Sequence, residues 1–190
     1  GATEIPNDGI DQNCDGVDTP LPVADLYCDG KTIDQLISGN AYNLIDNRDG
    51  HLGNKIKGTN NADLILASNS GNDIQAKDGN DCVIGGSDND KIYTGKGNDQ
   101  IFARDGNDKI HSGKGNDVIS GGAGNDNLQG HEGDDILNGN ENDDKIHGGK
   151  GNDNINGGTG INQCNGGQGT NNIINCVIKS MDEDSDESED

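Results

Sequence analysis

The sequence predicts an all-β solenoid, in which a short unit is wound repeatedly into stacked coils. A nine-residue pattern recurs thirteen times without a break between residues 58 and 174. Only 27% of the 190 residues are hydrophobic and 2% are aromatic, which is too little for a conventional globular core. Glycine is frequent instead, with 32 copies, and it suits closely spaced turns.

The repeat has the form G-G-x-G-x-D-x-U-x, where U is a large apolar residue, and residues 121 to 129 are its clearest copy. Position eight advances in unbroken steps of nine, and we expect its side chains to point inward while positions seven and nine point outward. The residues at position eight are Ile65, Ile74, Val83, Ile92, Ile101, Ile110, Ile119, Leu128, Leu137, Ile146, Ile155, Cys164 and Ile173.

Position six carries an acidic residue in most units. The residues there are Asp63, Asp81, Asp90, Asp99, Asp108, Asp117, Asp126, Asp135, Asp144 and Asp153, followed by Asn162 and Asn171. The second unit is an exception, because Asp73 comes one place late while Ile74 keeps the frame. A locally deformed turn over residues 68 to 73 would explain this shift.

This tract resembles the RTX (repeats-in-toxin) calcium-binding family over about three fifths of the chain. The resemblance implies a right-handed parallel β-roll, with a short strand at positions seven to nine, a turn at positions one to six, and two units in each coil. It also implies several Ca²⁺ ions between the turns of units n and n+2, held by turn carbonyls and by the position-six side chains of both units. The implied ligands are the ten position-six aspartates together with Asp73, Asn162 and Asn171.

Physical chemistry favours the same ion. Calcium takes six to eight oxygen ligands, and stacked coils repeat every ~4.8 Å. The aspartates then form an odd ladder (Asp63, Asp81, Asp99, Asp117, Asp135, Asp153) and an even ladder (Asp90, Asp108, Asp126, Asp144). Neighbouring charges at that spacing repel by roughly 3.5 kcal/mol at an effective dielectric constant of 20.

Adjacent aspartates make five pairs in the odd ladder and three in the even ladder, hence eight sites of best quality. Sites that use Asp73, Asn162 or Asn171 are expected to be weaker, because a shifted or neutral ligand compensates less of the charge of the ion. Without calcium, the repeat tract is expected to be largely unfolded.

The two outer faces differ. Odd units display apolar residues, among them Leu64, Leu66, Cys82, Ile84 and Phe102, whereas even units display Lys91, Lys109, Lys145, Gln75, His111, Gln129 and His147. We expect residues 29 to 57, with a short helix after Thr32 and a strand, to cap the first coil and cover part of the apolar strip. The alternative is a partner protein that docks around Ile84 and Phe102.

Three further regions complete the division of the chain. In residues 1 to 28, Asp11, Asn13 and Asp15 resemble the first half of an EF-hand, dockerin or thrombospondin-type calcium loop, although Pro22 stands where an EF-hand has its closing Glu; a plain Asp/Gly-rich linker is the alternative. Residues 58 to 178 are expected to form the β-roll. The tail, residues 179 to 190, is strongly acidic and is expected to be disordered.

Five cysteines, at positions 14, 28, 82, 164 and 176, lack the C-x-x-C spacing of a zinc site. The pairs closest in sequence are Cys14 with Cys28 and Cys164 with Cys176, which would leave Cys82 free. Small buried thiols are the alternative, since spacing does not determine connectivity.

The formal net charge of −22 argues against nucleic acid as a partner, and no apolar run is long enough to cross a bilayer. No hydrolase or metalloprotease motif occurs, and His111 and His147 are expected ~10 Å apart, too far to share an ion. We therefore expect an extracellular or cell-surface calcium-binding structural module rather than an enzyme. The alternative is a C-terminal secretion and folding module of a larger secreted hydrolase, epimerase or toxin.

Overall fold

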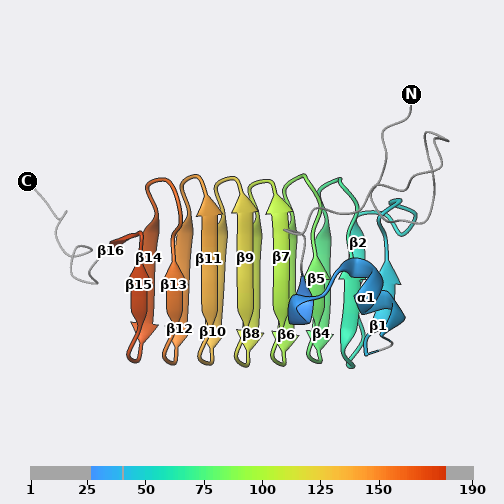
Figure 1. The fold of residues 1–190 in the computed structure, drawn as a ribbon, viewed down its shortest axis with the longest axis horizontal. Coiled ribbons are helices and arrows are strands. Elements are labelled where there is room, and N and C mark those ends of the chain that lie inside the picture. Colours follow the sequence, from blue (N-terminus) through green and yellow to red (C-terminus); the bar gives the residue numbers. More distant parts are fainter. Residues whose placement is uncertain (1–26, 40, 179–190) are drawn as a thin grey trace, which may run out of the picture.

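A computed structural model describes residues 27 to 39 and 41 to 178, and these form a parallel β-solenoid (Figure 1). A 3₁₀ turn, η1 (Cys28–Gly30), and a short helix, α1 (Ile33–Ser38), precede the first strand. All strands within these two described ranges then fall into two sheets of eight.

The odd sheet contains β1 (Asn43–Asp46), β3 (Asp63–Leu66), β5 (Cys82–Ile84), β7 (Gln100–Asp105), β9 (Val118–Ala123), β11 (Ile136–Glu141), β13 (Asn154–Asn156) and β15 (Asn172–Ile174). The even sheet contains β2 (Lys55–Lys57), β4 (Asp73–Asp78), β6 (Lys91–Lys96), β8 (Lys109–Lys114), β10 (Asn127–Glu132), β12 (Lys145–Lys150), β14 (Gln163–Gln168) and β16 (Val177–Ile178).

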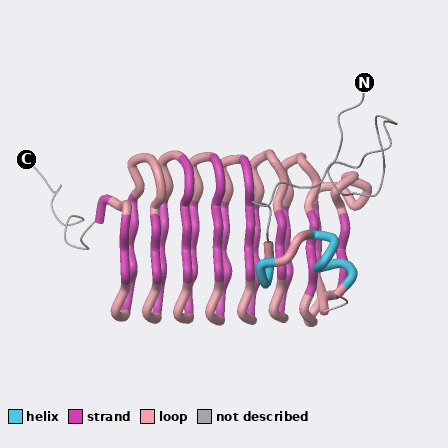
Figure 2. The backbone as a smooth tube through the Cα atoms, in the orientation of Figure 1, coloured by secondary structure: helices cyan, strands magenta, loops and turns pink. Residues whose placement is uncertain are grey.

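Two nine-residue units make one coil, as the family resemblance implies. Ile101 in β7 pairs with Ile119 in β9, and Ile110 in β8 pairs with Leu128 in β10, so the chain returns to the same place after 18 residues. Figure 2 shows the resulting row of parallel strands joined by short turns. In the described part of the chain, no helix is both long enough and apolar enough to span a bilayer.

Many strands are longer than the expected three residues. β7, for example, runs from position seven of one unit to position three of the next, and the same six-residue length recurs in β4, β6, β8, β9, β10, β11, β12 and β14. Lys96 in β6 still pairs with Lys114 in β8, which shows that positions two and three keep strand register after Thr94 and Ser112 at position one. The turn is therefore shorter than the repeat consensus suggests.

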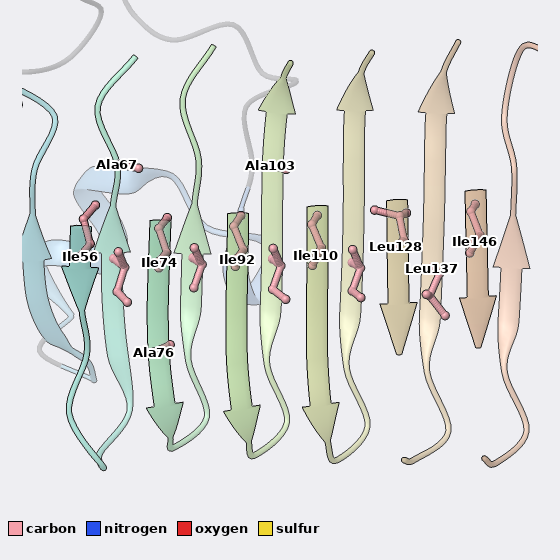
Figure 3. Close-up of a cluster of buried hydrophobic side chains, with 14 of the residues drawn as sticks. Ile56, Ala67, Ile74, Ala76, Ile92, Ala103, Ile110, Leu128, Leu137 and Ile146 are labelled. Carbon is pink, nitrogen blue, oxygen red and sulfur yellow. The ribbon is translucent and has the colours of Figure 1, made fainter. Parts of the chain in front are cut away.

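The core lies between the two sheets as a column of position-eight side chains (Figure 3). From Ile65 to Cys164 these residues are 0 to 2% exposed, so the predicted inward direction is confirmed. Position one also faces inward, where Ala76, Ala103 and Ser112 are buried beside the column. Only small residues occupy position one, which keeps the two sheets close together.

Residues 29 to 57, expected to form a cap with a short helix and a strand, contain α1, β1 and β2. β1 and β2 add one coil before the repeats, because they pair with β3 and β4. Thr32 caps α1: its hydroxyl accepts the Gln35 N–H, and the Gln35 side chain accepts the Thr32 N–H. Ile33 and Leu36 of α1 then pack in one cluster with the odd-sheet strip, described below.

The apolar strip around Ile84 is covered by the chain itself. Leu64, Leu66, Cys82 and Ile84 are at most 2% exposed in a cluster that includes Tyr27, Cys28, Ile33 and Leu36. Phe102 is partly buried, and its ring meets the ring of Tyr27 edge-on with 5.5 Å between centroids. The site suggested for a partner protein around Ile84 is therefore closed by the N-terminal cap.

One of the two disulfides differs from the nearest-neighbour expectation. Cys164 bonds to Cys176 as expected, but Cys28 bonds to Cys82 across 54 residues. Cys82 is thus not free, because the cap folds over the odd sheet and brings Cys28 to β5. Cys14, the candidate loop of Asp11, Asn13 and Asp15, and the acidic tail all lie outside the described residues.

Candidate metal centres

The position-six aspartates form two ladders, as predicted. All ten are between 0 and 3% exposed. In eight places the backbone N–H of one aspartate donates to Oδ1 of the next aspartate in the same ladder, 18 residues on, at 2.7 to 3.0 Å. Five of these contacts lie in the odd ladder and three in the even ladder.

Each of these contacts leaves one carboxylate oxygen without a partner. The buried atoms that accept no hydrogen bond in the described structure are the Oδ2 atoms of Asp81, Asp99, Asp117, Asp135 and Asp153 in the odd ladder and of Asp108, Asp126 and Asp144 in the even ladder. They belong to the second member of each aspartate pair, so there is one such oxygen for each of the eight pairs. A buried carboxylate oxygen without a partner needs a proton or a cation.

The first aspartate of each ladder is different. Oδ2 of Asp63 accepts the Thr59 N–H at 2.6 Å, and Oδ2 of Asp90 accepts the Gly86 N–H at 3.0 Å. These hydrogen bonds satisfy the oxygens that remain open in the other eight aspartates. The number of open oxygens therefore follows the number of aspartate pairs and not the number of aspartates.

Burial makes the ladder carboxyls hard to ionise. Desolvation is the largest cause, and it raises the pKa of Asp108 to about 8, of Asp81, Asp126 and Asp135 to about 7, and of Asp99 and Asp144 to about 6. Neighbouring ladder carboxylates add to the rise, as Asp126 and Asp90 do for the pKa of Asp108. Desolvation is also the largest cause that raises the pKa of Asp90, Asp117 and Asp153.

Beside four of the open oxygens, those of Asp126, Asp135, Asp144 and Asp153, the available space depends on glycine at position one. A Cβ added to Gly121, Gly130, Gly139 or Gly148 would collide with Oδ2 of the position-six aspartate of the same unit. The turn glycines are equally confined: Gly97 has φ +136°, and a Cβ there would collide with the carbonyl oxygen of Gly79 one coil earlier. Carboxylates and backbone carbonyls thus crowd the same turns.

Hard oxygen ligands of this kind suit Ca²⁺. Among the described residues, no three side chains of His, Cys, Asp or Glu come together as a possible metal site. An aspartate pair would therefore bring at most two carboxylates to a cation, and turn carbonyls or water would supply the other oxygens. The open Oδ2 atoms fit that arrangement, since each would gain an ion as its missing partner.

Four asparagines close the ladders. Asn162 and Asn171 follow the last aspartates, and their Oδ1 atoms accept the N–H groups of Asp144 and Asp153 at 2.8 and 2.7 Å. At the other end, Asn43 donates its side-chain amide to Asp63, and Asn72 donates both its backbone and side-chain N–H groups to Asp90. Neutral amides therefore end both ladders in both directions.

Asp73 does not lie in a ladder. Asn72 holds position six of the second unit, is 3% exposed and also bonds to the backbone carbonyls of Ser68 and Ser70. Asp73 begins β4 and pairs in register with Lys55 and Lys91. The turn therefore keeps the frame of its neighbours, and an asparagine takes the place of the aspartate.

Two further ladders, at position five of the odd and of the even units, were not anticipated. Each Oδ1 there accepts the N–H of the position-five residue one coil later, for example Asn98 Oδ1 from Asn116 at 2.9 Å and Asn107 Oδ1 from Asn125 at 2.7 Å. These bonds run along the exposed edge of the turns, beside the buried aspartates. The recurrent Asn-Asp dipeptide in the repeats is the sequence signal that would have revealed them.

The histidines of the even sheet lie at its surface, as expected, but one contact was missed. His111 Nδ1 and His131 Nε2 are 3.0 Å apart, and the ring of Tyr93 stacks on His111 with centroids 5.0 Å apart. Burial, followed by the charge of His131, lowers the pKa of His111.

Comparison with protein families agrees with this geometry. A family model described as RTX calcium-binding nonapeptide repeat (4 copies) matches the chain in overlapping windows that together span residues 57 to 173. No curated protein and no solved structure matches the chain significantly.

Proposed function

The chain belongs to the RTX calcium-binding nonapeptide repeat family, and from this premise we propose that it is an extracellular structural module completed by eight calcium ions. RTX repeats form a calcium-binding structural fold. The proposed ligands are the aspartate pairs of the odd and even ladders. Asn162 and Asn171 would extend the ladders as weaker, neutral ligands.

One observation carries the proposal: eight buried Oδ2 atoms without a partner coincide with eight aspartate pairs. In the absence of a cation, each pair leaves a buried carboxylate unsatisfied or forces it to take up a proton. With a cation between the members of a pair, the desolvated charges are compensated. Binding to the coil and not to the unfolded chain would then stabilise the coil.

Two disulfides support an extracellular location. Cys28–Cys82 and Cys164–Cys176 bracket the solenoid near its two ends, and such bonds persist mainly in oxidising compartments. A role in a cell-surface, matrix or adhesive protein is consistent with a rigid rod that has a disulfide near each end. The alternative role, as the secretion and folding module of a larger secreted enzyme or toxin, is distinguished by what the parent gene encodes before Gly1.

A calcium titration followed by circular dichroism tests the proposal, with magnesium in parallel. We expect little strand signal in metal-free buffer at pH 7.5 and a cooperative rise with calcium. Magnesium at the same concentrations is expected to have little effect, since it demands a smaller and more regular oxygen shell. Full strand signal in the presence of a chelator would show that the coil folds without the ion.

A further inference from the structure

The lysines of the described chain are concentrated on one sheet. Nine lysines lie on strands of the even sheet, and all nine are exposed: Lys55, Lys57, Lys77, Lys91, Lys96, Lys109, Lys114, Lys145 and Lys150. The same strands carry only three acidic residues, Asp73, Asp78 and Glu132. The odd-sheet strands carry no lysine and one arginine, Arg104. A chain of net charge −22 thus presents one distinctly basic face.

Six of these lysines form two parallel rows. β6, β8 and β12 each begin and end with a lysine, giving one row of Lys91, Lys109 and Lys145 and another of Lys96, Lys114 and Lys150. Register places Lys91 beside Lys109 and Lys96 beside Lys114, one coil apart at ~4.8 Å. The row that starts each strand makes no ion pair with any described residue, whereas Lys96, Lys114 and Lys150 pair with Asp78 or Glu132.

A shallow groove runs across the strands beside the second row. The position-two residues Gly95, Gly113, His131, Gly149 and Gly167 line it, together with Lys114, Lys150 and the Glu132 side chain that pairs with both lysines. Residues of β6, β8, β10, β12 and β14 all contribute, so the groove follows the solenoid axis over four coil spacings, about 19 Å. A groove of this shape suits a linear polymer, and the glycines on either side of His131 allow a sugar ring to approach the backbone.

The side chains of this face favour an anionic sugar polymer over a membrane surface, a peptide or a nucleic acid. On β2 to β14 of the even sheet, Tyr93 is the one large hydrophobic side chain that is exposed. A membrane surface or a docked peptide uses apolar anchors, and single-stranded nucleic acid uses several stacking aromatics. Gln75, Gln129 and Gln168 instead offer amides that can bond to hydroxyl groups.

We propose that the even sheet binds a linear anionic polysaccharide along the solenoid axis, and that it does so in the calcium-loaded state. The calcium dependence rests on the function proposed above. Eight divalent ions would change the formal charge from −22 to −6, and the seven acidic residues of the stretch from 181 to 190 account for all of that remainder. The lysine face would then act on a nearly neutral body, whereas the metal-free chain would repel a polyanion.

Binding to immobilised dextran sulfate tests the proposal, with neutral dextran as the uncharged reference. In calcium we expect saturable binding to dextran sulfate that weakens steeply with salt, and none to dextran. The variant K91Q/K109Q/K145Q removes the unpaired row and is expected to bind about tenfold more weakly or worse. The control I136E/N154E/N172E changes the net charge by the same three units on the exposed odd sheet, and it is expected to bind within about threefold of the wild type.

Three results would overturn the proposal: unchanged binding by the lysine variant, an equal loss in the control, or tighter binding to anionic vesicles or single-stranded DNA than to dextran sulfate. Bound calcium and circular dichroism are measured on the same samples. A folded, calcium-loaded protein that ignores dextran sulfate would refute this inference alone. A chain that takes up no calcium would refute the proposed function itself.

Discussion

Each interior aspartate of a ladder contacts two neighbours, one through its backbone N–H and the other through its carboxylate. Asp117, for example, donates to Asp135 Oδ1 at 2.9 Å and accepts from the Asp99 N–H at 2.8 Å. It is therefore a member of two pairs, whereas Asp153 closes the odd ladder and belongs to one aspartate pair. This difference between single residues predicts different losses of calcium.

Asp117→Asn is expected to lower the calcium content from eight ions to six, and Asp153→Asn to lower it to seven. In both variants the amide oxygen keeps the hydrogen bond but loses the charge that holds the ion. Equilibrium dialysis with metal analysis gives the count, and Asp105→Asn, at an exposed end of β7, is the control that should retain eight. Equal losses for Asp117→Asn and Asp153→Asn would contradict shared ligands.

Stability of the metal-free coil is expected to fall as pH rises from 5 to 8. The folded-state pKa values of Asp108, about 8, and of Asp81, about 7, lie above those of an unfolded aspartate. The folded state therefore binds more protons, so the stabilisation is complete below about pH 4 and is lost as pH passes through 6 to 8.

Calcium must displace these protons, so its affinity is expected to rise over the same interval. Circular dichroism of the metal-free chain at pH 5 and pH 8 checks the first effect, and calcium titrations at both pH values check the second. Asp108→Asn is expected to weaken the pH dependence of both. A metal-free strand signal that grows toward pH 8 would have the wrong sign.

At the scale of the elements, the turns depend on the absence of a side chain. Gly97→Ala adds a Cβ that collides with the Gly79 carbonyl at a φ of +136°, so the adjacent coils must separate. We expect the calcium-loaded protein to lose at least about 3 kcal/mol of unfolding free energy. Gly53→Ala is the matched control, because Gly53 also has positive φ, +72°, but has no atom within 4 Å of an added Cβ.

Gly53→Ala is expected to lose only about 1 kcal/mol of unfolding free energy, which is the cost of positive φ alone. Denaturant unfolding in calcium measures both values. Similar losses in the two variants would show that close stacking of the turns is not what requires glycine.

The Cys28–Cys82 disulfide links the cap to β5 and closes a loop of 54 residues. Replacing both cysteines by Ala is expected to cost about 4 kcal/mol by the loop-entropy estimate, and Cys164→Ala with Cys176→Ala about 3 kcal/mol for the shorter loop. Hydrogen exchange should locate the first effect in β3 and β5, where the cap covers Leu64 and Ile84. Unchanged protection of these strands would show that the cap holds without the bond.

The sequence predicts which residues face the core and the turn, but it predicts neither the length of the strands nor the disulfide of the cap. Ile119 and Asp117 could be placed because a period of nine fixes which residues face the core and which face the turn. The six-residue length of β9 could not be predicted, because the consensus assigns positions one to three to the turn, whereas their backbone keeps strand register. The Cys28–Cys82 bond was missed because the folding of the cap, and not the spacing, brings the two sulfur atoms together.

At the scale of the whole molecule, the ladders and the amides at their ends define a closed set of sites. The odd ladder, which runs from Asp63 to Asp153, and the even ladder, which runs from Asp90 to Asp144, were predictable from the repeat. The open Oδ2 atoms were not, because they depend on which oxygen the neighbouring N–H occupies. Asn72 likewise required the structure, since the sequence offered Asp73 as the nearer acidic residue.

The most direct test is a crystal structure of the calcium-loaded protein with anomalous scattering data that locate the calcium ions. We expect eight ions inside the turns, five along the odd ladder and three along the even ladder, each bonded to an Oδ2 atom that has no partner within the chain. Turns that hold only water, in crystals grown in ample calcium, would contradict the account.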